Sequence, residues 1–170
     1  MVNEFMQTTT IKDEVWKILE SVTDPEVPVL TILDLGVVRD VIIDKDEKIE
    51  VVITPTYSGC PAMNVIEIGI KASLQEAGFQ KIKVTTVLSP AWTTDWMSEA
   101  GKQKLKAYGI APPMSGEVDK NALFQETKKV PCPQCESTNT KMISQFGSTA
   151  CKALYKCIDC LEPFDYFKCL

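Results

Sequence analysis

Four cysteines in two closely spaced pairs constrain the fold of this chain more than any other feature. The pairs are Cys132 with Cys135 and Cys157 with Cys160, and together they follow the pattern C-x2-C-x21-C-x2-C. Each C-x-x-C folds into a tight knuckle that points two sulfur atoms at one place, and a short sheet joining two knuckles makes a tetrahedral four-sulfur site. The spacing therefore predicts a zinc ribbon with structural Zn²⁺ on these cysteines, and iron is the alternative metal. Two disulfides, or thiols without a shared role, are the alternative to a metal site.

The chain contains no histidine, and this absence limits its chemistry. It excludes a catalytic triad built on histidine, a histidine general base and a histidine-ligated catalytic zinc. A di-iron carboxylate site of the Glu-x-x-His type is excluded for the same reason, and flavin and nicotinamide fingerprints are absent. The sequence therefore predicts that the protein is not an enzyme, and that its metal is bound by cysteines alone or by cysteines with carboxylates.

Length and composition indicate one ordinary domain with a small appendage. The chain has 170 residues, of which 45% are hydrophobic. No apolar run approaches the ~18 residues of a membrane span, and residues 1–10 lack the pattern of a signal peptide. We therefore expect a cytoplasmic protein with no membrane contact, whose seven cysteines stay reduced and serve as ligands or reactive groups.

The distribution of charge argues against a nucleic-acid partner. Residues 1–127 hold 19 acidic and 12 basic side chains, while residues 128–170 hold 4 acidic and 6 basic ones. Neither part provides the basic surface on which binding to a phosphate backbone depends.

Hydrophobic periodicity predicts alternating helices and strands. The expected elements are helices 11–22, 61–78 and 95–108 and strands 37–43, 49–54 and 82–88. The order α-β-β-α-β-α predicts an α/β (α+β) fold, a small open sandwich with helices on a three-stranded mixed sheet, followed by the zinc ribbon. The predicted domains are residues 1–112 and 130–170, joined by a linker at 113–129.

The loop before the second predicted helix contains a lone cysteine, Cys60, between Gly59 and Pro61. Because proline suits the first helical position, we expect Cys60 at the N-cap. There the helix dipole and free N–H groups would lower the pKa of its thiol. The functional interpretation is a metal-binding or sulfur-reactive thiol, and the alternative is a small buried apolar residue.

Other polar and aromatic residues near the predicted sheet have two interpretations each. The loop carboxylates of Asp24 and Asp34 could bind metal, but such groups usually form caps and turns. Trp92 and Trp96 could line a pocket or dock a partner, but packing over the sheet edge is the commoner role.

Two further cysteines lie outside the two pairs. Cys151 is six residues before the second pair, and we expect an auxiliary thiol that is not a metal ligand. Cys169 is expected to be free or reactive.

Four short motifs together resemble the small iron–sulfur assembly domains typified by SufT and the MIP-type cytosolic cluster-targeting proteins. The resemblance covers about residues 10–110 and rests on Asp24-Pro25-Glu26, Asp34-Leu35-Gly36, Thr54-Pro55-Thr56 and Cys60-Pro61. With the segments 146–152 and 162–169, the whole chain is similar to the PaaD family, whose members are encoded with the components of phenylacetyl-CoA epoxidase.

The resemblance implies an accessory factor that matures the metal or iron–sulfur centres of that multicomponent oxygenase in phenylacetate degradation. The key cysteine of the family corresponds to Cys60, and its Thr-x-Thr motif to Thr54 and Thr56. Asp24 and Asp34 complete the residues expected to relay iron or a cluster. The implied partner is a protein client, an oxygenase or reductase component. Transient binding of iron or a cluster, and a homodimer, are left open.

Two hypotheses follow from the sequence. In the first, the chain assembles or carries a metallocluster through Cys60. In the second, it is a structural adaptor that docks the oxygenase through the ribbon and the tryptophans, and Cys60 is inert. A thiol enzyme is a weaker third hypothesis, because no base or resolving thiol lies near Cys60 in the sequence.

Overall fold

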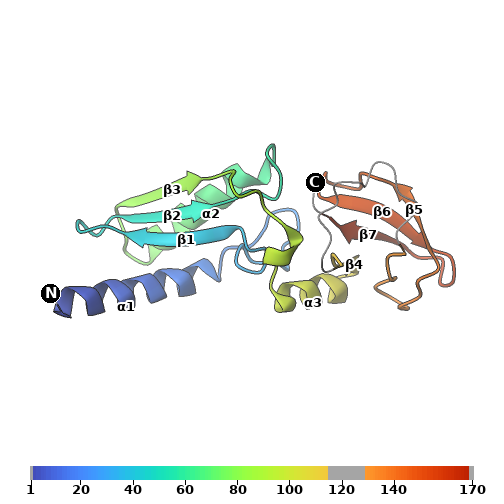
Figure 1. Ribbon diagram of the computed structural model, residues 1–170, viewed down its shortest axis with the longest axis horizontal. Helices are drawn as coiled ribbons and strands as arrows, with labels where there is room; N and C mark the ends of the chain where they lie inside the picture. The colour runs from blue at the N-terminus through green and yellow to red at the C-terminus, as the bar shows by residue number, and fades with distance from the viewer. Residues whose placement is uncertain (1, 115–128, 169–170) are drawn as a thin grey trace. The chain divides into compact units, whose positions relative to one another are not determined.

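The computed structural model describes residues 2–114 and 129–168, and these fall into two compact units (Figure 1). The N-terminal unit comprises residues 1–92 and the C-terminal unit residues 93–170. Cys169 lies outside the described residues, as does most of the predicted linker. No helix within the described ranges is long and apolar enough to cross a membrane.

The N-terminal unit is built on a three-stranded mixed sheet, as predicted. Its strands are β1 (Val38–Ile43), β2 (Ile49–Ile53) and β3 (Ile82–Thr86), in the order β1-β2-β3. β1 and β2 form an antiparallel hairpin, whereas β2 and β3 are parallel, because the helix between them returns the chain to the same end of the sheet.

Two helices pack on this sheet and fill the core. They are α1 (Val2–Leu19) and α2 (Ala62–Glu76). Helical spacing puts Ile66, Ile70 and Leu74 of α2 in the core. Val15 and Leu19 of α1 are fully buried beside them. The buried side chains of both helices are the apolar residues whose helical spacing predicted these elements.

The predicted bounds of α1, residues 11 and 22, are wrong. The helix begins at Val2 and ends at Leu19, three residues before the predicted end. Val22 leaves the helix because its carbonyl accepts a hydrogen bond from the N–H of Ile32, 3.0 Å away, which starts the loop leading to β1.

One end of the sheet gathers the loops that carry the predicted site. The loop after β2 begins there, and the N–H of Thr54 donates to the carbonyl of Val37, 2.9 Å away, immediately before β1. The chain after β3 reaches the same end, where the N–H of Val87 donates to the carbonyl of Ile53 at 2.8 Å. The carboxyl ends of parallel strands are the usual place for ligands in open α/β sheets.

The C-terminal unit contains a four-stranded sheet. The strands are β4 (Ile110–Ala111), β5 (Thr140–Ser144), β6 (Lys152–Cys157) and β7 (Pro163–Phe167), in the order β4-β7-β6-β5. The aromatic side chains of Tyr155, Phe164 and Tyr166 are buried together on one face and form the core of the ribbon.

The predicted helix 95–108 is two elements, a 3₁₀ turn η1 (Thr94–Trp96) and the helix α3 (Glu99–Ala107). The break occurs because Ser98 is extended and its hydroxyl accepts a hydrogen bond from the N–H of Gly101, which starts a new helix. α3 ends at Ala107, and Gly109 follows two residues later with a φ of 90°, which favours glycine.

The two compact units divide between residues 92 and 93, and β4 pairs with β7 of the ribbon sheet. α3 and β4 therefore belong to the same compact unit as the ribbon. The domain boundaries predicted at 112 and 130 stay a prediction.

Candidate functional site

The four paired cysteines converge in the C-terminal unit. Their sulfur atoms all lie within 4.8 Å of one another, with Cys132 and Cys160 3.7 Å apart and Cys135 and Cys157 3.5 Å apart. Zinc–sulfur bonds of about 2.3 Å in a tetrahedron place sulfur atoms about 3.8 Å apart. The donor set therefore fits a four-thiolate metal, and the zinc-ribbon architecture predicted from the spacing is confirmed.

The two knuckles have matching backbone hydrogen bonds. In the first, the N–H of Cys132 donates to the carbonyl of Ser137 at 2.9 Å. In the second, the N–H of Cys157 donates to the carbonyl of Glu162 at the same distance. Each bond closes a loop of the same length, so the two pairs present their sulfur atoms in the same way.

A left-handed residue follows each pair and completes this match. Glu136 has a φ of 62° and Leu161 a φ of 68°. The reversal turns the next N–H, that of Ser137 or Glu162, toward the sulfur of the preceding cysteine. Donors of this kind stabilise a thiolate ligand.

Side chains outside the metal group tie the knuckles together. Asp159, inside the second pair, accepts hydrogen bonds from the hydroxyl of Ser137 and from the side-chain amide of Asn139. The N–H of Ile158 donates to the carbonyl of Asn139 at 2.8 Å. The hydrogen bonds from Ser137 and Asn139 hold the pKa of the Asp159 carboxyl below its usual range.

The crowding of the thiols favours a bound cation at this site. Hydrogen bonds from the backbone N–H groups of Cys160 and Asp159 lower the pKa of Cys157 to about 7. The N–H of Glu162 also favours the Cys160 thiolate, but burial and the neighbouring sulfur atoms outweigh it and raise the pKa of Cys160 to about 12. Ionisation of Cys157 thus opposes ionisation of Cys160, and a bound metal ion would compensate both negative charges.

Cys151 is separate from this group. It is buried, and its sulfur lies 3.1 Å from the hydroxyl of Thr149. It is not among the side chains that converge on the metal position.

Cys60 lies at the end of the N-terminal sheet where the loops gather. Its thiol is half-buried, and its carbonyl accepts a hydrogen bond from the N–H of Met63. The predicted N-cap assignment is wrong by one residue, because Pro61 is the N-cap and Ala62 is the first helical residue.

The prediction of a lowered pKa for Cys60 is also wrong. Burial raises the pKa of the thiol, and the carboxylates of Glu26 and Asp24 raise it further. The N–H of Ala62 and the hydroxyl of Tyr57 favour the thiolate but do not compensate. The sequence shows that Cys60 lies beside a helix start, which would lower its pKa. It does not show that the fold brings the carboxylates of Glu26 and Asp24 close enough to raise that pKa.

Asp24 and Asp34 both shape the loops before β1. A carboxylate oxygen of Asp24 accepts hydrogen bonds from the N–H groups of Glu26 and Val27, at 2.9 and 2.8 Å. Asp34 accepts from the N–H of Thr31 at 3.0 Å and donates its own N–H to the Thr31 hydroxyl at the same distance. Both carboxylates are thus turn formers, and Asp24 also acts electrostatically on Cys60.

Thr54 has a buried hydroxyl without a partner. The residue is 1% exposed, and its Oγ1 is the one buried side-chain oxygen or nitrogen in the described ranges that has no hydrogen bond. Such a group costs stability unless something else satisfies it. Thr56, the other threonine of the motif, is partly exposed in the same loop.

Sequence reasoning missed Tyr57 and favoured the correct role for Trp92. Tyr57, whose hydroxyl contacts the Cys60 thiol, drew no attention, although its place three residues before the cysteine was a usable signal. Trp92 is buried and donates its indole N–H to the carbonyl of Leu35 at 2.8 Å, so the packing interpretation is confirmed for it.

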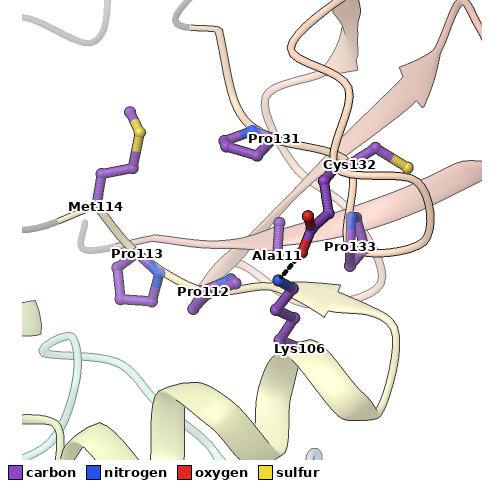
Figure 2. Close-up of a pocket in the computed structure, with 9 residues that line it drawn as sticks. Lys106, Ala111, Pro112, Pro113, Met114, Pro131, Cys132 and Pro133 are labelled. Atoms are coloured by element: carbon purple, nitrogen blue, oxygen red, sulfur yellow. Dashed lines mark hydrogen bonds and ion pairs between the residues drawn. The ribbon is translucent and has the colours of Figure 1, made fainter.

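The C-terminal unit also contains an apolar pocket of about 310 Å³, formed where β4 ends and the first knuckle begins. Its lining is Lys106, Ala111, Pro112, Pro113, Met114, Pro131, Cys132, Pro133 and Glu136. Figure 2 shows the prolines around the pocket and the ion pair that Lys106 forms with a carboxylate at its side. This lining suits an apolar side chain.

Known proteins resemble both units. Residues 12–88 match the family described as "Iron-sulfur cluster assembly protein", and residues 116–168 match the "PaaD zinc beta ribbon domain". Across 157 residues the chain is 47% identical to an Escherichia coli (strain K12) protein named as a component of a "Putative 1,2-phenylacetyl-CoA epoxidase". The matched region covers 92% of this chain and 92% of that protein.

Other similarities concern the N-terminal region alone. A "Fe-S protein maturation auxiliary factor" of Porphyromonas gingivalis is 32% identical, over 62% of this chain and 97% of that protein. The crystal structure of a domain of unknown function, DUF59, from Bacillus anthracis superposes with a TM-score of 0.53 at 30% identity, over 57% of this chain and 92% of that one.

Proposed function

The chain belongs to the PaaD family, as its motifs predicted, and we propose that it is an accessory factor for phenylacetyl-CoA epoxidase in phenylacetate degradation. In this role it helps to mature the metal or iron–sulfur centres of the oxygenase or reductase component, and it is not itself the catalyst. Two relatives of the N-terminal unit are named as iron–sulfur protein maturation factors, which supports the assignment.

The observation that carries the proposal is the position of Cys60. It is the sole cysteine among residues 1–92, in the region that matches the iron–sulfur assembly family. It is half-buried at the end of the sheet where three loops meet, within electrostatic range of the carboxylates of Glu26 and Asp24 and close in the chain to the unpartnered hydroxyl of Thr54. A thiol packed as an inert core residue would not need such polar surroundings.

The surrounding residues suit a cargo that is held briefly. The Cys60 sulfur would bind iron, or one iron of a cluster, and Tyr57 would orient the sulfur. Thiolate-ligated clusters are anionic, so the carboxylates of Asp24 and Glu26 would weaken their retention. Weak retention favours transfer over storage. Thr54, Thr56 and Asp34 would shape the loops around the cargo.

The ribbon has a separate role in the proposal. Its four cysteines would hold one zinc ion, which supplies a cross-link that a sheet with a small core needs for stability. The second candidate function is an adaptor that docks the oxygenase through this unit while Cys60 is inert. The apolar pocket beside the first knuckle is the observation that favours it.

The experiment that separates the two functions is co-production of the epoxidase components with the Cys60→Ser variant. If Cys60 relays iron, the client is expected to be deficient in iron, while the zinc content of the variant stays at one per chain. The measurements are elemental analysis and visible spectroscopy of the anaerobically purified client.

The matched control is Cys151→Ser, which removes a thiol outside the metal group and is expected to leave client iron normal. A fully metallated client with Cys60→Ser would eliminate the relay and leave the adaptor, even if deletion of the whole protein abolished activity.

A further inference from the structure

The N-terminal unit supplies too few ligands at Cys60 to hold an iron–sulfur cluster by itself. Iron–sulfur clusters are usually held by four cysteines. Residues 1–92 provide one, and the chain has no histidine. Within the described residues, one group of three or more potential metal ligands converges on a single point, and it is the group of four ribbon cysteines. Under the proposed function, ligands of the client would complete the site and come within a few ångströms of the Cys60 sulfur.

The surface next to Cys60 is apolar on α2. The helix buries one face at Ala62, Ile66 and Ile70, and it exposes Val65 and Ile68 on another. These two side chains are 54% and 67% exposed, and residues three apart on a helix are neighbours. Both lie in the first two turns after Cys60, at the same end of the sheet.

A third exposed apolar side chain reaches this end from β3. Leu88 is 61% exposed, and it follows Val87, whose N–H is bonded to the carbonyl of Ile53 at the end of β2. Single exposed aliphatic residues are common, whereas exposed apolar residues that gather into one patch mark interaction surfaces.

The negative charge of the N-terminal unit indicates the charge expected on the partner surface. The carboxylates of Glu26 and Asp24 act on Cys60, and residues 1–92 hold 14 acidic against 8 basic side chains. A complementary surface would be apolar with basic residues around it.

We propose that Val65, Ile68 and Leu88 form a docking collar around Cys60. The collar would receive a client protein that presents cysteine ligands for iron beside an apolar surface with a basic rim. This inference rests on the proposed function and deepens it, because it assigns the contact through which cargo is passed.

The test uses the full-length double variant Val65→Gln/Ile68→Gln and the purified, metal-free oxygenase and reductase components as probes. Glutamine preserves helix propensity and removes the apolar groups. Loss of two central apolar contacts is expected to weaken binding to one component about tenfold or more. Client iron after co-production should fall toward the level found with Cys60→Ser.

The matched control is Ile42→Thr. Ile42 is 47% exposed on β1, near the opposite end of the sheet, and threonine suits a strand. It should bind the client like the unmodified chain. Leu88→Gln, outside the helix, provides a second collar variant if the double variant fails to fold.

The outcomes distinguish the two proposals. If both collar variants bind the client normally and leave its iron content unchanged, while Cys60→Ser still lowers client iron, the proposed docking collar is wrong and the proposed function stands. If the client has a normal iron content with Cys60→Ser, the proposed function is wrong, and so is the proposal that cargo is exchanged at the collar. If the collar variants alter only self-association, the surface is an interface between copies of this chain and the proposed client is wrong.

Discussion

The two cysteine sites of this molecule differ in how much of a metal site each contains. The ribbon assembles four sulfur atoms, matching backbone donors and a cross-brace through Asp159, all within one unit. The N-terminal site has a single thiol, Cys60, whose surroundings include carboxylates that oppose its ionisation. The ribbon supplies four thiols to one site, whereas the N-terminal site supplies one.

This difference indicates different uses of metal. A closed four-thiolate site retains its ion and contributes to folding, because the apo state leaves crowded thiols uncompensated. A site with one thiolate binds iron weakly and exposes it to a second ligand set. The comparison therefore favours a structural metal in the C-terminal unit and a cargo at Cys60, and the predictions below test it.

The largest expected effect is that of Cys135→Ser. Loss of one ligand should abolish zinc binding and unfold the C-terminal unit, because structural zinc contributes roughly 10–16 kcal/mol in small zinc domains. Elemental analysis should find no zinc, and amide hydrogen exchange should show lost protection in β5–β7 with β1–β3 unchanged. Cys151→Ser should keep one zinc per chain. Zinc retained in Cys135→Ser, or disulfides in the unmodified ribbon, would contradict the assignment.

A smaller effect is expected at the left-handed position after the second pair. Leu161 has a φ of 68° and an exposed side chain, so its replacement changes mainly the backbone. Leu161→Val should destabilise the ribbon by about 1–2 kcal/mol relative to Leu161→Gly, because a β-branched residue is strained there. The midpoint of denaturant unfolding of the C-terminal unit, at fixed zinc concentration, provides the measurement. Equal midpoints would show that the left-handed turn is not required.

Thr54→Val should have a still smaller effect, and of opposite sign. It removes a buried hydroxyl that has no partner, so we expect the N-terminal unit to gain about 1 kcal/mol in unfolding free energy. Thr56→Val, at a partly exposed position, should change stability little. A loss of stability in Thr54→Val would show that the hydroxyl has a ligand that the chain alone does not supply.

The last prediction concerns the reactivity of Cys60. Because burial and nearby carboxylates raise its pKa, the thiol should be protonated at pH 7.5 and react with iodoacetamide more slowly than in the urea-unfolded chain. The rate in the folded chain should keep rising with pH above the range in which an ordinary cysteine is already ionised. Mass spectrometry of the Cys60 peptide measures this. Faster alkylation of the folded form at neutral pH would contradict the raised pKa of Cys60 and support the lowered pKa that the sequence predicted.

Much of the fold could be read from the sequence, since the signals are local. Apolar residues at helical spacing identified α1 and α2, and C-x-x-C pairs identified the ribbon. The errors also have local causes. The end of α1 depends on a hydrogen bond from Ile32 to Val22, and the split of helix 95–108 depends on the cap formed by Ser98. Neither interaction has a periodic signature.

The sequence by itself determined which residues can bind metal, because ligand type and spacing are written in the chain: four paired cysteines, one lone Cys60 and no histidine. Only the tertiary structure decided what surrounds them. Asp24 and Glu26 are more than thirty residues from Cys60 and reach it because β1 runs antiparallel to β2, which returns the loop before β1 to the end of the sheet. The pKa of a thiol depends on burial and on charges in space, so its direction at Cys60 followed from the packing and not from the helix start that the sequence displayed.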